Sequence, residues 1–378
     1  MSAANVLLLI KSLGRGGAEQ LLVNAAPYLD RNRYRYQVAY MLRDQDALVP
    51  ELREASLDVH CLEAGQGPGW VWRLRELVRS RRTELVHVHS PLAAIGARLG
   101  LRGVRGLRLV YTEHNVWERY HRVTYWGNLL TFSRNDHVFA VSDHVRTSIR
   151  YPRLLRYRRL PPVETLYHGI DPAAEREGAA GADVRRELGI APDAPVVGTV
   201  ANFKEHKGHR FLLEAADRVR REIPGARFVL VGSGPLETEI RRQVAKLSLQ
   251  DAVVFAGFRE DAWRAASAFD VFALASVHEG LSLAVVEALA LGKPAVVTRA
   301  GGLPEVVEHG RQGLVVPARD PRALADAIIR LLEDAELRRS MGTAARRRAD
   351  DFDIRPAVRR IETVYAGLLG GGAGKRAA

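Results

Sequence analysis

The 378-residue sequence contains a single cysteine, Cys61, and its first apolar run is short. One cysteine cannot form an intrachain disulfide, so nothing indicates an oxidising compartment. The first apolar run has only five consecutive residues, Val6 to Ile10, which is too few for a signal-peptide core or a membrane span. We therefore expect a buried strand at this position and a cytoplasmic protein.

Aromatic residues are also scarce, at 7% of the chain, although 56 Lys and Arg against 44 Asp and Glu give a net charge of +12. A basic protein favours phosphate-rich partners such as nucleic acid, anionic lipid or an anionic substrate, and the alternative is a generally basic surface. The few aromatic residues and the lack of a recognition motif argue against nucleic acid. A non-catalytic, basic nucleic-acid-binding protein therefore stays only as an alternative.

Short apolar runs of β-forming residues alternate with amphipathic helical patterns in two series. Between the series, residues 171–195 are rich in Ala, Gly, Asp and Pro, which predicts a linker with one short helix. The alternation predicts an α/β protein with two Rossmann-like, doubly wound domains that face a central cleft. We expect these domains at 1–170 and 171–351, a terminal helix at 352–369 and a disordered tail at 370–378.

Each series has a glycine-rich turn after a strand, and each turn is a candidate phosphate site. The first turn contains Gly16 and Gly17, and the second contains Gly232 and Gly234. Glycines let a backbone approach a phosphate closely, and the following helix N-terminus supplies free N–H groups. A tight strand-to-helix turn without a ligand is the alternative for both.

Charged residues lie in two further turns of the second series. Lys207 follows a strand and precedes Gly208, where a cation can meet a diphosphate, although a lysine in a loop is usually only solvated. Glu279 lies after the strand DVFALAS, and Ser282 is a plausible N-cap of the helix that carries Glu287. Carboxylates are natural acceptors for the vicinal hydroxyls of a ribose or sugar, and pairing with nearby arginines is the alternative.

The pattern around the two glutamates resembles a known family. Glu279 and Glu287 are separated by seven residues, and EALALGKPAVV begins at the second. The pattern is similar to the signature of retaining nucleotide-sugar glycosyltransferases with the GT-B fold, family 4. Matching motifs span nearly the whole chain: GRGGAE at 14–19, TEHN at 112–115, VS at 141–142, HGID at 168–171, KG at 207–208, LVGSGPLE at 230–237, FAGF at 255–258 and GGLPEVV at 301–307.

The resemblance implies a role for particular residues of this chain. Glu287 would bind the nucleotide ribose, Glu279 would contact donor-sugar hydroxyls near the anomeric centre, and Lys207 would neutralise the departing diphosphate. His114 would lie beside the donor sugar. The catalytic residues expected in this way are Glu279, His114 and Lys207, and the donor-binding residues are Gly16, Gly17, Asn202, Lys207, Gly232, Gly234, Phe258, Glu279, Gly280, Leu281, Ser282 and Glu287.

One position departs from the family pattern. Five residues before the lysine the family usually has an arginine, and here that position is Asn202. An asparagine can donate a hydrogen bond but carries no charge, so one phosphate contact is in doubt. Arg15 or Arg299 could take its place.

The resemblance implies a cytoplasmic hexosyltransferase that moves a sugar from a UDP- or GDP-sugar to an acceptor hydroxyl with retention. It needs no metal or other cofactor, and we find no metal-ligand set in the sequence. The acceptor would be a saccharide or lipid-linked part of a cell-envelope polysaccharide or glycolipid. A nucleotide-sugar epimerase of similar fold is the nearest enzymatic alternative, against which the Gly-Gly-Ala-Glu turn argues.

Residues 69–84 combine apolar and basic side chains in a helical pattern, typical of an interfacial helix on anionic lipid. This segment predicts peripheral contact with the inner face of the membrane. The alternative is an ordinary crossover helix, with its apolar stripe on the sheet and its arginines solvated. The residues concerned are Trp70, Trp72, Leu74, Leu77 and Val78, with Arg73, Arg75, Arg79, Arg81 and Arg82.

Overall fold

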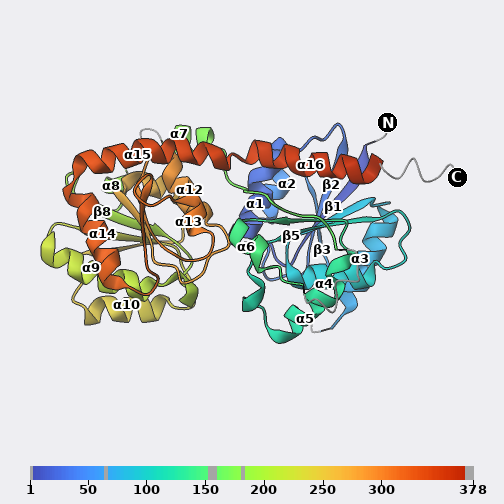
Figure 1. Ribbon diagram of the computed structural model, residues 1–378, viewed down its shortest axis with the longest axis horizontal. Helices are drawn as coiled ribbons and strands as arrows, with labels where there is room; N and C mark the ends of the chain where they lie inside the picture. Colours follow the sequence, from blue (N-terminus) through green and yellow to red (C-terminus); the bar gives the residue numbers. More distant parts are fainter. Residues whose placement is uncertain (1–2, 64–66, 152–159, 180–183, 371–378) are drawn as a thin grey trace. The chain divides into compact units, whose positions relative to one another are not determined.

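The computed structural model describes residues 3–63, 67–151, 160–179 and 184–370. The chain forms two compact units. Unit 1 comprises residues 1–168 and 354–378, and unit 2 comprises residues 169–353. Most of the tail expected at 370–378 lies outside the described residues. Each unit is a doubly wound α/β fold built on one parallel sheet, which confirms the predicted fold class (Figure 1).

The sheet of unit 1 has seven parallel strands in the order β3-β2-β1-β4-β5-β6-β7. The direction of strand addition reverses between β1 and β4, which is where ligands of such folds bind. The strands are β1 (Ala4–Ile10), β2 (Tyr34–Tyr40), β3 (Asp58–Cys61), β4 (Leu85–Val88), β5 (Arg108–Glu113), β6 (His137–Ala140) and β7 (Val163–Thr165).

Alternating side chains of β1 enter two different cores, one on each face of this sheet. Val6, Leu8 and Ile10 pack with residues of α1 (Gly17–Ala25), α2 (Val49–Glu54) and α16 (Ile354–Gly370). Leu7 and Leu9 pack on the opposite face with α3 (Gly69–Ser80), α4 (Pro91–Gly100) and α5 (Arg122–Thr131). A strand covered on both faces therefore reads as an unbroken apolar run, as the sequence of β1 does.

The sheet of unit 2 has six parallel strands in the order β10-β9-β8-β11-β12-β13, and its direction reverses between β8 and β11. The strands are β8 (Val196–Val200), β9 (Arg227–Val231), β10 (Val253–Gly257), β11 (Val271–Leu274), β12 (Ala295–Thr298) and β13 (Gly313–Val316). The main helices are α9 (His209–Glu222), α10 (Glu237–Lys246), α11 (Ala262–Ala265), α12 (Leu283–Ala290), α14 (Pro321–Glu333) and α15 (Ala335–Ala349).

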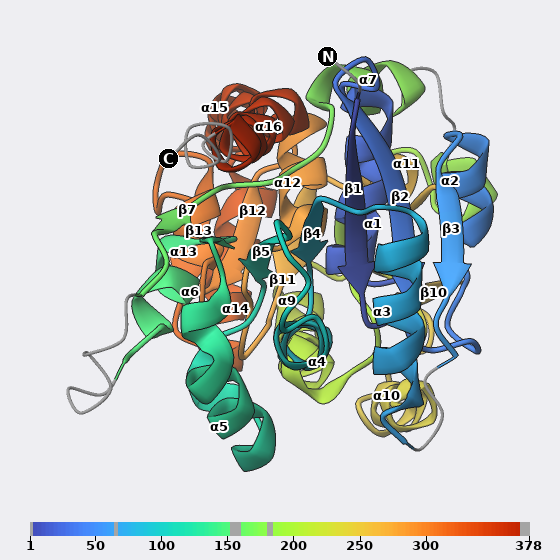
Figure 2. The ribbon, with the colours of Figure 1, turned by 90° about the vertical axis from the view of Figure 1, so that its right-hand side faces the viewer.

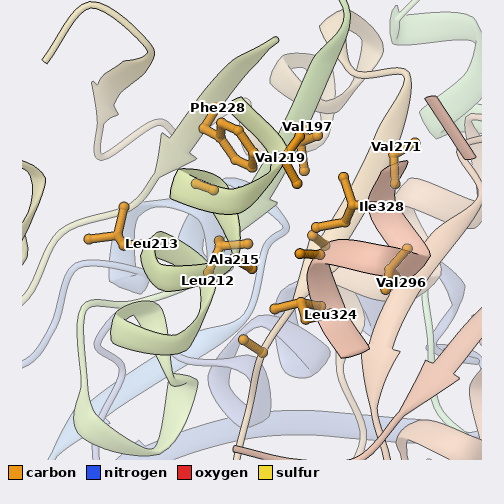
Figure 3. Packing of buried hydrophobic residues seen from close by; sticks show 14 of the residues in the cluster. Val197, Leu212, Leu213, Ala215, Val219, Phe228, Val271, Val296, Leu324 and Ile328 are labelled. Carbon is orange, nitrogen blue, oxygen red and sulfur yellow. The ribbon is translucent and has the colours of Figure 1, made fainter. Parts of the chain in front are cut away.

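Helices α9 and α14 cover one face of the second sheet. Figure 3 shows Leu212 and Val219 of α9 pointing toward Ile328 of α14 and toward Val197 and Phe228 of the strands. These side chains recur at helical spacing and are almost fully buried. The apolar stripe of each helix therefore fixes its orientation on the sheet. Helix α12 packs against β11 and β12.

The linker expected at 171–195 is more structured than its composition predicts. It contains two helices, α7 (Pro172–Ala179) and α8 (Val184–Glu187). Helix α7 packs against α11 and α12, and there is no room for a side chain at Gly178 because the ring of Trp263 lies there. The prediction of one short helix is wrong because the Ala, Glu and Arg residues of α7 favour a helix and packing against distant residues stabilises it.

The terminal helix α16 belongs to unit 1, where it lies beside α1 (Figure 1). Its buried face makes polar as well as apolar contacts. The Tyr365 hydroxyl lies 2.5 Å from Nδ1 of His87. The Glu362 carboxylate accepts hydrogen bonds from the Tyr36 hydroxyl at 2.7 Å and the Asp30 amide at 2.8 Å. Loss of the helix would leave these buried groups unpaired, which costs more than the loss of apolar contact alone.

We expect truncation after Phe352 to destabilise unit 1, because apolar residues and buried polar groups then face water. Two substitutions of Tyr365 separate the contribution of its hydroxyl group to stability from that of its ring. Tyr365→Phe keeps the ring and should cost about 1 kcal/mol of unfolding free energy, whereas Tyr365→Ala should cost about 3–5 kcal/mol. Urea denaturation measures both. The exposed Thr363 on the same helix provides a control, since Thr363→Ala should have little effect. A fully stable truncated chain would contradict this account of α16.

Candidate functional site

Two loops of unit 2 meet at the point where its sheet reverses direction. Strands β8 and β11 are neighbours, so the loops that follow them, residues 201–208 and 275–282, leave the same edge side by side. The Val277 amide donates to the His206 carbonyl at 2.7 Å. Gly208 has φ +68°, and a Cβ atom there would lie 2.1 Å from the Ala275 carbonyl oxygen. Only glycine allows this approach.

The approach places Lys207 against Glu279. The Lys207 ammonium donates to Glu279 Oε1 at 2.5 Å, and the Ser276 hydroxyl donates to the same oxygen at 2.8 Å. The carboxylate is 8% exposed and the lysine side chain 18% exposed. A largely buried carboxylate is retained when such partners compensate for its lost hydration. Among the described residues, the partner of Glu279 is thus a lysine, not the arginine of the alternative interpretation.

The backbone of Glu279 is also held in place. Its carbonyl accepts a hydrogen bond from the Gly302 amide at 3.2 Å. Gly301 has φ +58°, and a Cβ atom there would lie 1.7 Å from that carbonyl oxygen. The loop after β12 therefore packs closely on the loop that carries Glu279. Both the side chain and the main chain of this residue are fixed before any ligand binds.

The glycine-rich turn after β9 packs on the loop of Asn202. A Cβ atom on Gly232 would lie 2.1 Å from the Ala201 carbonyl oxygen. The Phe203 amide donates to the Ser233 carbonyl at 2.9 Å, and the Leu236 amide donates to the Phe203 carbonyl at 3.1 Å. The structure therefore brings Gly232, Gly234 and Asn202 together at the carboxyl ends of β8 and β9. The tight packing is a sufficient reason for glycine at these positions even without a ligand. It also leaves the phosphate-binding interpretation open.

Arg299 and Phe258 follow other strands of the same sheet. Arg299 comes directly after β12 and is exposed, so a cation other than Lys207 is available at this edge. Phe258 follows β10 and is 40% exposed. The Gly232 amide donates to the Gly257 carbonyl at 2.8 Å, which links the turns after β9 and β10. Arg15 lies in the other unit.

Glu287 lies on the second turn of α12, and Ser282 is the N-cap, although its side chain makes no capping hydrogen bond. Gly280 and Leu281 lie in the loop before it. Burial raises the pKa of Glu287 above that of an exposed glutamate. No hydrogen bond or ion pair joins Glu287 to Glu279 in the described part of the chain.

The neighbour of Glu287 is Glu175 on α7, which sequence reasoning missed. One carboxylate oxygen of Glu175 is buried without a hydrogen-bond partner. Burial, and then the negative charges of Glu287 and Asp171, raise its pKa. Two close carboxyl groups cannot both ionise without repulsion, so they favour a state that holds one proton. Glu175 was missed because the composition of residues 171–195 indicates a linker, in which a glutamate is expected to be solvated.

In unit 1 the candidate residues lie at the carboxyl ends of β1 and β5. Gly16 is the N-cap of α1, and Gly17 is its first residue. The Glu19 carboxylate accepts a hydrogen bond from the Ser12 hydroxyl at 2.8 Å. A Cβ atom on Gly16 would lie 2.3 Å from that carboxylate. The Glu19 side chain therefore folds back close to the N-cap, and a larger residue there would make this flexible side chain move.

His114 directly follows β5, and its loop is held by the preceding residue. The buried Glu113 carboxylate accepts hydrogen bonds from the Trp117 indole at 2.9 Å, the Asn115 amide at 3.2 Å and the Tyr120 hydroxyl. Burial raises the pKa of Glu113 despite these donors. Burial and then His89 and His168 lower the pKa of His114. His114 is therefore a neutral imidazole on an anchored loop.

Among the described residues we find no group of three or more His, Cys, Asp or Glu side chains that could hold a metal ion. Lys207, Arg299 and the helix N-termini at the strand ends can stabilise an anion.

Comparison with known proteins identifies sequence and structural similarity along most of the chain. The family described as glycosyl transferases group 1 matches residues 182–348, and glycosyltransferase family 4 matches residues 15–174. A GDP-mannose-dependent phosphatidylinositol monomannoside mannosyltransferase of Mycobacterium tuberculosis is 30% identical over 303 residues, 74% of each chain. An N-acetyl-alpha-D-glucosaminyl L-malate synthase of Bacillus anthracis is 28% identical over 79% of this chain and 78% of the relative. The Anabaena protein HepE in complex with UDP superposes with a TM-score of 0.82 at 25% identity, covering 96% of this chain and 100% of HepE.

The acid pair of Glu175 and Glu287 predicts a pH dependence of stability. Because its folded-state pKa is raised, Glu175 keeps a proton in the folded state that the unfolded chain releases. Its stabilising contribution is full below the ordinary pKa of 4.5 and is lost as pH rises through the raised value. Glu175→Gln stays neutral, so at about pH 9 it should be more stable than the wild type by about 1 kcal/mol, with little difference near pH 5.

Urea denaturation over this pH range measures the difference. The control is Glu177→Gln, which removes the same charge from an exposed position on the same helix. Equal pH profiles for the wild type and Glu175→Gln would show that neither burial nor Glu287 raises the pKa of Glu175 in the folded state.

Proposed function

The chain belongs to the glycosyl transferases group 1, and we propose that it is a retaining enzyme that transfers a sugar from a nucleoside-diphosphate sugar to an acceptor hydroxyl. The observation that carries this proposal is the Lys207–Glu279 pair at the carboxyl ends of β8 and β11. A cation and a hydroxyl acceptor side by side are what the diphosphate and the sugar of such a donor require.

Each donor group has a proposed partner in unit 2. The ribose hydroxyls donate to Glu287, and Ser282 and the backbone of Gly280 and Leu281 contact the donor in the loop before α12. Gly232 and Gly234 let the backbone approach the diphosphate, with Asn202 and Lys207 as donors. The base lies near Phe258. In unit 1, Gly16, Gly17 and His114 are proposed to face the donor phosphates and sugar.

In the proposed reaction the acceptor oxygen replaces the diphosphate oxygen at the anomeric carbon with retention of configuration, and the proton of the acceptor hydroxyl passes to the departing diphosphate. The electron pair of the broken bond stays on the diphosphate, so negative charge develops there. Lys207 neutralises that charge, and Glu279 orients the sugar hydroxyls so that the anomeric carbon is placed correctly. The proposal needs no metal ion, because fixed cationic and N–H groups stabilise the leaving group.

The names and ligands of the relatives support the proposed classes of donor and acceptor. The Mycobacterium tuberculosis relative is named for GDP-mannose and a phosphatidylinositol glycolipid, and HepE was determined with UDP. We propose a UDP- or GDP-sugar as donor and a saccharide or lipid-linked acceptor in cell-envelope polysaccharide or glycolipid synthesis.

Substitution of the two glutamates should affect different steps, nucleotide binding for Glu287 and turnover for Glu279. Glu287→Ala should weaken binding of the free nucleoside diphosphate about tenfold or more, because a charged acceptor for the ribose is lost. Glu279→Ala should depress turnover while the affinity for the nucleoside diphosphate changes little. Calorimetry with UDP and GDP gives the first quantity, and release of nucleoside diphosphate from the matching sugar donor gives the second.

The exposed Glu308 offers a control, because Glu308→Ala removes an acid far along the chain from both loops. Small, equal effects of Glu279→Ala and Glu287→Ala on both quantities would mean that the acids are structural.

The segment at residues 69–84 contains a crossover helix in the structure, so it does not by itself present the apolar surface expected for membrane contact. Trp70, Leu74 and Val78 are buried against the sheet, as in an ordinary crossover helix, and among the expected anchors Trp72 is the one with high exposure, at 73%. Arg81 pairs with Asp58 at 3.2 Å. No helix among the described residues combines the length and apolar composition needed to cross a bilayer.

Helix α4 packs against both α3 and α5 (Figure 2), and the arginines of these helices are at the surface apart from Arg98, which is buried. Residues 69–134 contain twelve arginines and four glutamates, so they hold +8 of the net charge of +12. The peripheral membrane contact that we propose rests on the surface of these helices. Its exposed apolar side chains are Trp72, Leu92, Leu99, Val123, Trp126 and Leu130.

Vesicle co-sedimentation tests this contact. Changing Arg79, Arg81 and Arg82 to Gln should cost about 3 kcal/mol of affinity for anionic vesicles, at about 1 kcal/mol for each charge. Trp126→Ser should weaken binding without any change in charge. Zwitterionic vesicles are the control. If the wild type ignores anionic vesicles at moderate salt, or the triple variant binds equally well, a non-membrane acceptor is the better account.

A further inference from the structure

Three histidines from different parts of unit 1 form a row near the carboxyl ends of its strands. His89 directly follows β4, His114 directly follows β5, and His168 lies three residues after β7. The ring centroids of His89 and His114 are 5.7 Å apart, and those of His114 and His168 are 6.4 Å apart. Strand β4 adjoins β1, where the direction of the sheet reverses. The row therefore begins where a doubly wound fold binds its ligand.

In the part of the chain that the structure describes, most nitrogens of these rings lack a hydrogen-bond partner, and the contact of His168 with the Leu166 backbone falls short of normal hydrogen-bond geometry. Both ring nitrogens of His89, both of His168 and Nε2 of His114 are buried, and none makes a hydrogen bond of normal geometry among the described residues. His89 is 6% exposed and His168 is 3% exposed. Buried polar atoms are nearly always paired in folded proteins, so five such nitrogens in one row mark a place where polar atoms from outside the protein are expected.

The adjoining His87 differs from the three histidines of the row, because both of its ring nitrogens have partners within the protein. Its ring lies 4.3 Å from that of His89, but Nδ1 lies 2.5 Å from the Tyr365 hydroxyl and Nε2 lies 2.7 Å from the Thr112 hydroxyl. The protein thus supplies hydroxyl partners to the inner histidine. It supplies none to His89 and His168.

We propose that His89 and His168 extend His114 into a three-histidine subsite that binds the hydroxyl groups of a sugar or polyol. The ligand class rests on the proposed function, since a sugar-transferring enzyme handles hydroxylated substrates. A hydroxyl group donates one hydrogen bond and accepts others, and a neutral imidazole does the same. The partners that His87 finds within the protein are themselves hydroxyls.

The charge state of the row favours hydroxyls over anions. Burial, followed by the neighbouring histidines, lowers the pKa of His89, and burial lowers the pKa of His168 to about 4. No carboxylate is among the groups that perturb them, so nothing there stabilises an imidazolium. A carboxylate or a phosphate diester only accepts hydrogen bonds and would leave the unprotonated ring nitrogens unpaired, and the negative charge of any phosphate would find no imidazolium to pair with. The row also does not qualify as a metal site among the described residues.

The experiment uses the full-length protein with ¹³C-labelled histidine rings, observed by NMR. The probes are glucose, mannose, inorganic phosphate, UDP, GDP, UDP-glucose and GDP-mannose. We expect the signals of His89 and His168 to shift with a sugar and not with inorganic phosphate. A shift with a sugar nucleotide but not its free nucleotide assigns the subsite to the donor sugar. A shift with free sugar added to the nucleotide-saturated protein assigns it to the acceptor.

Paired substitutions separate hydrogen bonding from packing. His89→Phe keeps a ring but loses both polar atoms, and we expect about tenfold weaker binding of the sugar that shifts the His89 signal, with UDP or GDP affinity unchanged. His89→Gln retains a donor and an acceptor and should lose about twofold at most. His60→Gln, on the edge strand β3, is the matched control. Urea denaturation identifies any variant that fails to fold.

The subsite is disproved if the His89 and His168 signals respond to none of the sugars or sugar nucleotides, or if His89→Phe and His89→Gln bind sugar equally well. This outcome with normal release of nucleoside diphosphate leaves the proposed function intact. A protein that binds no nucleotide and releases none loses the proposed function itself, whereas free sugar can still report on the subsite.

Discussion

The contact between the loops after β8 and β11 is the constraint on which the candidate donor site depends. Gly208 approaches the Ala275 carbonyl so closely that any side chain there would clash, and this approach places Lys207 on Glu279. The pair is mostly buried, so each charge would be costly without the other. On the other side, Gly301 packs against the Glu279 backbone. Glycines thus position the charged pair by allowing three loops to meet, with Glu279 between the other two.

Among the described residues, some buried ionisable groups beyond this pair lack a hydrogen-bond partner. Glu175 has an unpaired carboxylate oxygen, and His89 and His168 have unpaired ring nitrogens. Such groups lower stability unless something else pairs with them, and the apolar cores of both units supply the stability that makes them tolerable. By contrast, the buried polar groups of α16 are satisfied internally, since Glu362 and Tyr365 find partners on the first sheet. Satisfied groups hold the fold together, and unsatisfied groups mark places for ligands.

The fold could be predicted from the sequence wherever local pattern and burial agree. The unbroken apolar run of β1 indicates a strand covered on both faces, and the structure shows both covers. The loop position of Glu279 followed from the strand before it and the helix after it. The packing of α7 could not be predicted, because residues distant in sequence stabilise it, and Glu175 was missed with it. The sequence of helix α3 could not show whether its apolar side chains pack on the sheet or face a membrane, because core and interfacial helices have the same apolar period.

The central claim is that Lys207, fixed by these loops, binds the diphosphate of a sugar nucleotide. Thermal unfolding with UDP-, GDP- and ADP-sugars tests it most directly, because a bound ligand raises apparent stability by mass action. The account predicts that one donor at saturating concentration raises the melting temperature of the wild type by about 2–4 °C. The same donor should raise that of Lys207→Met much less, whereas Lys204→Met, at an exposed position in the same loop, should respond like the wild type. No shift with any donor, or an equal shift for Lys207→Met, would contradict the account.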